Sequence, residues 1–111
     1  MMPRYVTFFS YTGQTWDRMI SNPGDRMVVL KATAESLGAS VESLHFMLGE
    51  HDGMVVVNAP DSVTMAAFVT TALGSVALAS AQTHELFTQE QLGEVLAKAG
   101  QARAAYRPPG A

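Results

Sequence analysis

The 111-residue chain contains no cysteine, which excludes disulfides, thiolate catalysis and cysteine-ligated metal sites together. Charge is also scarce: charged residues make up 15% of the chain, and the net charge is −3. Phosphate recognition needs clustered Lys and Arg, whereas the seven basic residues are scattered from Arg4 to Arg107. Nucleic acid is therefore not an expected partner.

Long apolar runs are missing as well. No run approaches the ~20 residues of a membrane-spanning helix, and the N-terminus leads directly into a predicted strand instead of a signal peptide. The three histidines have no metal-ligand spacing, and no phosphate-binding loop or nucleophile elbow is present. We therefore expect a cytoplasmic protein with no membrane partner, no metal site and no cofactor.

Hydrophobic residues, in contrast, are abundant at 48% of the chain. A chain of this length forms one domain with a limited interior, so part of its apolar surface needs a cover from elsewhere. Self-association is the simplest way to provide that cover.

Residue patterns predict strands and helices that alternate along the chain. Strand-like residue patterns predict strands over 4–11, 40–48, 53–58 and 76–87, of which 53–58 is apolar on both faces and is therefore expected to be central. Helical spacing and start signals predict helices over 14–20, from Asn22-Pro23 to Gly38, over 62–73 after Asp61, and from the Thr88/Gln91 capping box to about Gly100. We assign 1–100 to one domain and 101–111 to a flexible C-terminal tail.

The element order predicts an α+β protein with a ferredoxin-like βαββαβ fold, a four-stranded antiparallel sheet and an added C-terminal helix. Right-handed crossovers place both principal helices on one side of the sheet, so the opposite face has no cover from its own chain. We expect a second copy to cover that face, which makes the protein a homodimer with a partly polar cavity. The residues expected on the uncovered face in the first two strands are Tyr5, Thr7, Phe9, Tyr11, Ser43, His45 and Met47.

Four short motifs occur in an order that resembles the GYD-domain family. They are Tyr5-Val6-Thr7-Phe8, the turn Gly49-Glu50-His51-Asp52, the strand end Ala59-Pro60-Asp61, and Phe87-Thr88 before the last helix. The resemblance covers residues 3–95. It implies a small bacterial protein of the dimeric α/β-barrel superfamily, whose members include cofactor-free monooxygenases, haem-degrading enzymes, lactone isomerases and small-molecule sensors. The fold therefore implies a cavity without implying a reaction.

The family is named for a Gly-x-Tyr-Asp turn, in which this chain has Gly49, His51 and Asp52. If the family's Tyr does chemistry through its hydroxyl, His51 cannot repeat it; if that Tyr packs or hydrogen-bonds, His51 can replace it. Turn geometry alone explains Gly49 and Asp52, by a positive φ and a side-chain bond to amides. A functional interpretation has Asp52 orienting His51 as a base at a cavity mouth, although adjacent strand residues point to opposite faces.

The candidate ligand-binding residues are those that share the expected open face: Thr7, Phe9, Tyr11, His45 and Met47. Among them His45 could bind a ligand or transfer a proton, and His84 on the fourth strand could do the same, with Tyr11 as a helper. The alternative is a structural role, with these imidazoles hydrogen-bonded within a dimer interface, and for His45 this interpretation is favoured. Alternation in the fourth strand does not decide which of its two polar rows lines the cavity.

Two functions remain open at this point. The first is a homodimer that binds a small molecule in a cavity on the uncovered sheet face. The alternative is a cofactor-independent enzyme, monooxygenase-like or isomerase-like, that uses a cavity histidine for proton transfer.

Overall fold

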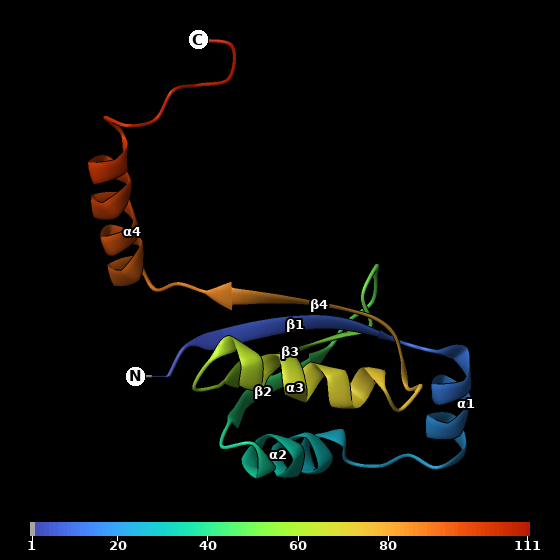
Figure 1. Cartoon of the computed structure of the whole chain (residues 1–111). Coiled ribbons are helices and arrows are strands. Elements are labelled where there is room, and N and C mark those ends of the chain that lie inside the picture. The colour runs from blue at the N-terminus through green and yellow to red at the C-terminus, as the bar shows by residue number, and fades with distance from the viewer. Residues whose placement is uncertain (1) are drawn as a thin grey trace.

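Four antiparallel strands form one sheet in the order β2-β3-β1-β4, and two helices cover one side of it (Figure 1). The structure is a computed structural model and describes residues 2–111. The elements are β1 (Arg4–Tyr11), α1 (Gly13–Ser21), α2 (Arg26–Ser36), β2 (Ser40–Phe46), β3 (Gly53–Asn58), α3 (Ser62–Leu73), β4 (Leu78–Leu86) and α4 (Gln89–Ala102). This topology confirms the predicted ferredoxin-like α+β fold.

Helix starts follow from side chains that accept hydrogen bonds from otherwise unpaired amides. Asp61 caps α3 through the Thr64 amide, and Thr88 caps α4 with the reciprocal bond from Gln91 that completes a capping box. The predicted start of α2 at Asn22-Pro23 is wrong. Asp25 is the cap, because its carboxylate accepts from the amides of Met27 and Val28, and the chain before it approaches in an extended form.

Strand register decides which side chains share a face. Thr7 lies opposite Val55 on β3 and Thr83 on β4, and all three belong to the side covered by α2 and α3. The neighbouring row, Val6 with Val56 and His84, belongs to the open side. Successive residues of β1 therefore point to opposite sides of the sheet.

The prediction that Tyr5, Thr7, Phe9 and Tyr11 lie on the uncovered face is wrong, because all four are buried on the helix-covered side. Both rows of β1 are apolar, so alternation alone could not choose between them. The larger aromatic rings fill the space between the sheet and the helices. Ser43 and His45 do lie on the open side with Val56 and Met54, whereas Met47 follows the end of β2.

The core lies between the sheet and the helices α2 and α3. Val57 and Met65 are its largest fully buried side chains, and Ala34 on α2 and Ala59 directly after β3 are fully buried as well. Phe68 on α3 completes the layer over the sheet. Burial of these side chains accounts for why α2 and α3 pack on this side.

The last helix does not join this core. In Figure 1, α4 leaves the end of β4 on the side of the sheet opposite to α2 and α3 and stands away from the other elements. None of its residues is buried. The radius of gyration is consequently 17.8 Å, compared with about 13 Å for a compact domain of this length.

Candidate functional site

A cavity of about 250 Å³ lies between the sheet and the helices α2 and α3. The strand β1 forms its floor, α2 and α3 form its walls, and the turn after α3 closes one end. Its lining is mostly apolar with a few polar groups: Thr7, Phe9, Tyr11, Arg26, Val29, Leu30, Thr33, Val55, Phe68, Val69, Thr71, Ala72, Ser75, Ala77 and Leu78.

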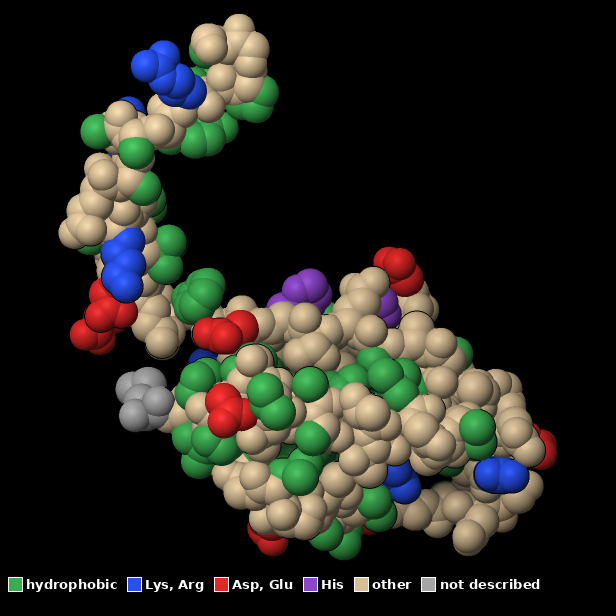
Figure 2. All heavy atoms as spheres, viewed as in Figure 1, with side chains coloured by type: hydrophobic (Ala, Val, Ile, Leu, Met, Phe, Trp, Pro, Cys, Tyr) green, Lys and Arg blue, Asp and Glu red, His purple; other side chains and the backbone are tan. Residues whose placement is uncertain are grey.

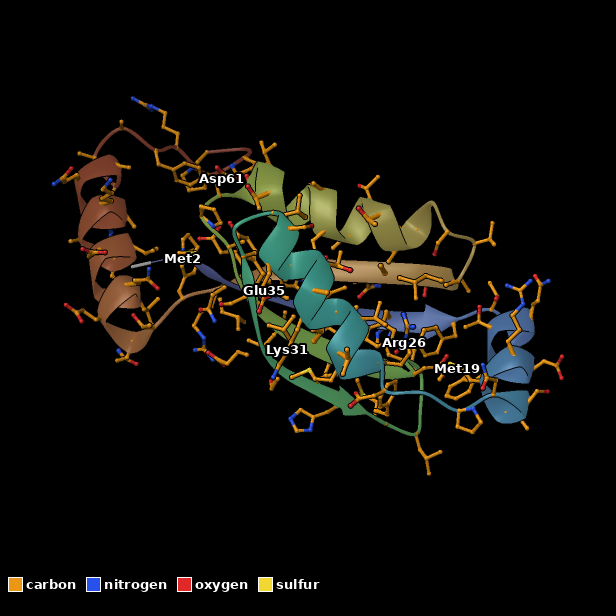
Figure 3. All side chains as sticks on the ribbon, turned by 90° about the horizontal axis from the view of Figure 1, so that it is seen from below. Met2, Met19, Arg26, Lys31, Glu35 and Asp61 are labelled. Carbon is orange, nitrogen blue, oxygen red and sulfur yellow. The ribbon has the colours of Figure 1, made fainter. Side chains whose placement is uncertain are left out.

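Arg26 is the charged side chain among the described residues that line this cavity. It lies in the first turn of α2, directly after the Asp25 cap that fixes where the helix begins, and it is half-buried over the sheet (Figure 3). Its guanidinium lies close enough to the hydroxyl of Tyr11, at the end of β1, to act on the pKa of that hydroxyl. A fork of guanidinium donors suits a carboxylate or a similar oxyanion.

Tyr11 contributes a neutral hydroxyl to the same end of the cavity. Burial raises the pKa of Tyr11 above its ordinary value, the Arg26 guanidinium opposes this shift, and the Asp52 carboxylate adds to it. The hydroxyl is therefore a hydrogen-bond donor near neutral pH. Further along the floor the Thr7 and Thr83 hydroxyls are 2.8 Å apart, so Thr7 already has a partner within the protein.

The size of the cavity limits what it can hold. An apolar cavity of about 150 Å³ accommodates benzene. A cavity of about 250 Å³ thus fits one ring, or a short aliphatic chain, with a small polar substituent. The arrangement can bind such a molecule with the apolar part among Phe9, Leu30 and Phe68 and the polar part at Arg26 and Tyr11.

The Gly49–Asp52 turn has a structural role next to the cavity. Gly49 has a φ of +134°, a conformation that favours glycine. The Asp52 carboxylate accepts hydrogen bonds from the Tyr11 amide at 2.8 Å and from the Trp16 indole at 3.1 Å. It therefore ties the β2–β3 hairpin to the end of β1 and to α1, and it holds Tyr11 in position.

His51, the neighbour of Asp52, points to the other side. Its ring packs against Phe8 with ring centroids 5.5 Å apart, and Phe8 belongs to the open row of β1. The Asp52 carboxylate accepts hydrogen bonds from the Tyr11 amide and the Trp16 indole and not from His51, so it does not orient that imidazole as a base. Trp16 anchors α1 through this bond and is absent from the cavity lining.

The histidines gather on the open face of the sheet, where Figure 2 has purple side chains on the surface opposite to α2 and α3. His45 is paired with Met54, and His84 packs against Phe8 with ring centroids 6.2 Å apart. Within residues 2–111, no three side chains of the metal-ligating types form a group that could hold an ion.

The structure therefore divides the predicted ligand-binding residues into two sets. Thr7, Phe9 and Tyr11 line a cavity, but this cavity lies on the helix-covered side. His45, His84 and Met47 lie outside its lining, and no histidine is among the lining residues described.

Sequence reasoning missed Arg26, Leu30, Thr33 and the α3 residues of the cavity. The available signal was the Asp25-Arg26 pair: a capping carboxylate fixes the helix start, which places the next residue in the first turn over the sheet.

Three comparisons with known proteins bear on this architecture. A search of curated proteins finds no match. Among solved structures, the crystal structure of MtbAldR is similar, with a TM-score of 0.54, 15% sequence identity and coverage of 78% of this chain. The chain spans about half the length of that protein, 53%, and the likeness at this identity establishes the fold alone.

Within residues 2–111, no helix is both long and apolar enough to cross a membrane. The family comparison matches the GYD domain over residues 5–96, which includes the sheet, the cavity, the Gly49–Asp52 turn and the first half of α4. This chain therefore belongs to the GYD-domain family.

Proposed function

We propose that the protein binds a small molecule in the cavity between the sheet and the helices α2 and α3. The ligand class is a single aromatic ring or a short aliphatic chain that carries one carboxylate or comparable oxyanion. The observation that carries this proposal is the position of Arg26 and Tyr11 at one end of a cavity of about 250 Å³ whose other walls are mostly apolar.

The electrostatics of the cavity favour an anionic group over a neutral one. Arg26 is half-buried and is the one charged side chain among the described lining residues, so no lining carboxylate neutralises it there. A charge that is partly removed from water gains from a partner of opposite sign. The apolar remainder of the cavity supplies affinity through burial and excludes ligands with several charges.

Binding is better supported than catalysis. The enzyme alternative relied on His45 or His84 in the cavity, and both lie on the opposite side of the sheet. Tyr11 is a hydrogen-bond donor whose raised pKa makes it a poor base near neutral pH. We therefore assign the cavity to recognition of a ligand.

We further propose that the protein is a homodimer through the open face of the sheet. Phe8 and Met54 are partly exposed across the two central strands, β1 and β3, and together with the already buried Val6 and Val56 they form an apolar block. A solvated sheet face normally alternates to polar residues, which this face does not do at its centre. A second copy offers the same patch about a two-fold axis and covers both at once.

Benzoate is a suitable first probe of the cavity because it combines one ring with one carboxylate. We expect it to bind with a dissociation constant of about 0.1–1 mM, as its few atoms allow. Benzyl alcohol of similar size should bind more weakly. The measurement is an NMR titration of the wild type.

Three variants make this test specific. Arg26→Gln should weaken benzoate binding and narrow the gap between benzoate and benzyl alcohol. Lys31→Gln, on the same helix but exposed and outside the lining, is the matched control and should bind as the wild type does. Ala72→Leu fills space from α3 and should reduce binding of both probes. Equal binding of benzoate to the wild type and Ala72→Leu would place its site elsewhere and contradict the proposal.

Sedimentation velocity of the wild type tests the dimer separately from the cavity. We expect a dimer at micromolar concentrations. A monomer at all concentrations would refute dimerisation without affecting the ligand titration.

A further inference from the structure

The helix α4 cannot owe its stability to its own sequence. It has 14 residues, which is marginal for an isolated helix in water. It also contains Gly93 and Gly100, and each glycine makes a helix less stable than an alanine at the same position would. A helix of this composition needs a surface to pack against, and none of its residues is buried within its own chain.

One side of α4 is built for such packing. Leu92, Val95 and Leu96 recur at helical spacing and are 41%, 44% and 61% exposed. Glu94 and Lys98 lie on the other side of the helix. Figure 2 has hydrophobic side chains on the side of α4 that faces the space above the open face of the sheet, and charged side chains on the outer side.

The position of α4 identifies what can occupy that space. It extends from the end of β4 away from the sheet, on the open side that lies opposite to α2 and α3 (Figure 1). Stacked sheets lie about 10 Å apart. A second sheet placed on the open face would therefore lie beside the apolar side of α4, and α4 would extend along it.

The area of the proposed dimer interface gives an independent reason to expect α4 to contact the second copy. The open face of four strands measures about 19 Å by 23 Å. Stacking two such faces buries about 900 Å², below the roughly 1,200–2,000 Å² of stable interfaces. A 14-residue helix is about 21 Å long and 10 Å wide, so two helices packed on the opposite copies add about 800 Å². The two sheets alone therefore bury less area than a stable interface does, whereas the sheets together with both helices bury enough.

We propose that α4 of each copy packs through Leu92, Val95 and Leu96 against the second copy and thereby clamps the dimer. The inference rests on the proposed homodimer and adds the element that stabilises it. The short link Phe87-Thr88, with Phe87 60% exposed, directs α4 away from its own body toward the partner.

The first test is a pair of variants of the full chain with equal changes in charge. Leu92→Glu with Leu96→Glu places two carboxylates on the apolar side and should weaken dimerisation by about 100-fold or more. Ala97→Glu with Gln101→Glu places two carboxylates on the outer side and should leave the dimer unchanged. Sedimentation at several concentrations measures both, and benzoate binding checks that the sheet and helices α2 and α3 remain folded.

The second test asks which copy α4 touches. Because the chain has no cysteine, Lys98→Cys gives a single attachment site for a spin label on the outer side of α4. Spin-labelled chains without ¹⁵N are mixed with unlabelled ¹⁵N chains, so any broadening of amide signals comes from the other copy. We expect broadening of amides in the unlabelled copy.

The outcomes separate the two proposals. A wild-type dimer that is weakened by the Leu→Glu pair and shows broadening between copies supports the clamp. A dimer that tolerates the Leu→Glu pair, or lacks broadening between copies, refutes the clamp and leaves the dimer intact. A wild-type protein that stays monomeric and shows no broadening between the mixed chains refutes both, because no second copy is then in contact with α4.

Discussion

At the centre of the sheet both faces are apolar, yet they differ in the size and chemistry of their side chains. The covered face carries the rings of Tyr5, Phe9 and Tyr11 beneath α2 and α3. The open face carries Val6 and Met54 at its centre, with histidines around Phe8. The face with the larger rings is the one that packs on helices and contains a cavity.

On the central strand β1, hydrophobicity alone does not identify the covered face, because both of its rows are mostly apolar. Helices are round and leave deep spaces above a pleated surface, and the rings of Tyr5, Phe9 and Tyr11 reach further into these spaces than short side chains do. A second sheet is flatter and matches short side chains. Side-chain size therefore distinguishes the two faces where polarity fails.

The largest difference between the two faces is expected when the same carboxylate is placed on each face of β3. Val57 is fully buried on the covered face, so Val57→Asp should cost several kcal/mol and unfold the chain. Met54 lies on the open face, so Met54→Asp should leave each copy folded and separate the dimer. Circular dichroism with sedimentation tests both, and a folded Val57→Asp would reverse the assignment of faces.

A second prediction uses the hairpin residues His51 and Asp52, which point to different faces. Asp52→Ala removes the acceptor for the Tyr11 amide and the Trp16 indole and should cost about 3 kcal/mol. Trp16 is the single tryptophan, so its fluorescence should shift toward that of a solvated indole.

The matched control for this hairpin is His51→Tyr, which restores the family's turn residue. Its ring can keep the contact with Phe8 on the open face, so the unfolding free energy and the Trp16 fluorescence should be close to those of the wild type. A loss of stability equal to that of Asp52→Ala would mean that the two positions act together.

A smaller effect is expected at Gly53, where β3 passes beneath a ring of the covered face. A Cβ at this position would run into the Phe9 ring, which is buried and lines the cavity. Gly53→Ala should cost about 1–2 kcal/mol, because the ring must move in a packed environment. Benzoate affinity should change with it, and an unchanged affinity would separate Phe9 from the ligand site.

The smallest predicted effect concerns the α3 wall of the covered face. Hydrogen bonds from the Thr64 amide and hydroxyl hold the pKa of Asp61 below its ordinary value. The cap therefore contributes stability that is present above the pKa of the unfolded chain and is lost as the pH falls through the lower folded value. Urea unfolding at pH 7 and pH 3 should show this loss.

Asp61→Asn is the control for the pH dependence, because Asn caps a helix without a titrating group. We expect this variant to be slightly less stable at pH 7 and to lose less stability between pH 7 and pH 3 than the wild type. An identical loss in both proteins would assign the acid sensitivity to other carboxyl groups.

The elements themselves could be predicted from local signals. The patterns predict 4–11, 53–58 and 62–73 with the bounds that the structure has, because alternation, a continuous apolar run after a turn, the Asp61 cap and the Gly74 stop act over a few residues. The start of α2 was displaced to Asn22-Pro23 because two good capping residues, Asn22 and Asp25, lie within one turn of each other. Local rules do not rank two adequate caps.

The candidate site could be predicted only in part. Thr7, Phe9 and Tyr11 were selected as cavity residues from one row of β1, and they line a cavity. The predicted side of the sheet is wrong. The residues expected beside this row of β1 are His45 and Met47, whereas the cavity that the row lines includes Arg26. The contacts that decide this join β1 to α2, and sequence spacing carries no information on them.

The sequence by itself determined the order of elements, the antiparallel hairpin at Gly49–Asp52 and the membership of the chain in its family, because these depend on residue patterns along the chain. The tertiary structure alone decided which face of the sheet received the helices, where the cavity lies and that α4 stands apart. Packing compares the shapes of surfaces that are distant in sequence, and two apolar rows of one strand differ in shape more than in hydrophobicity.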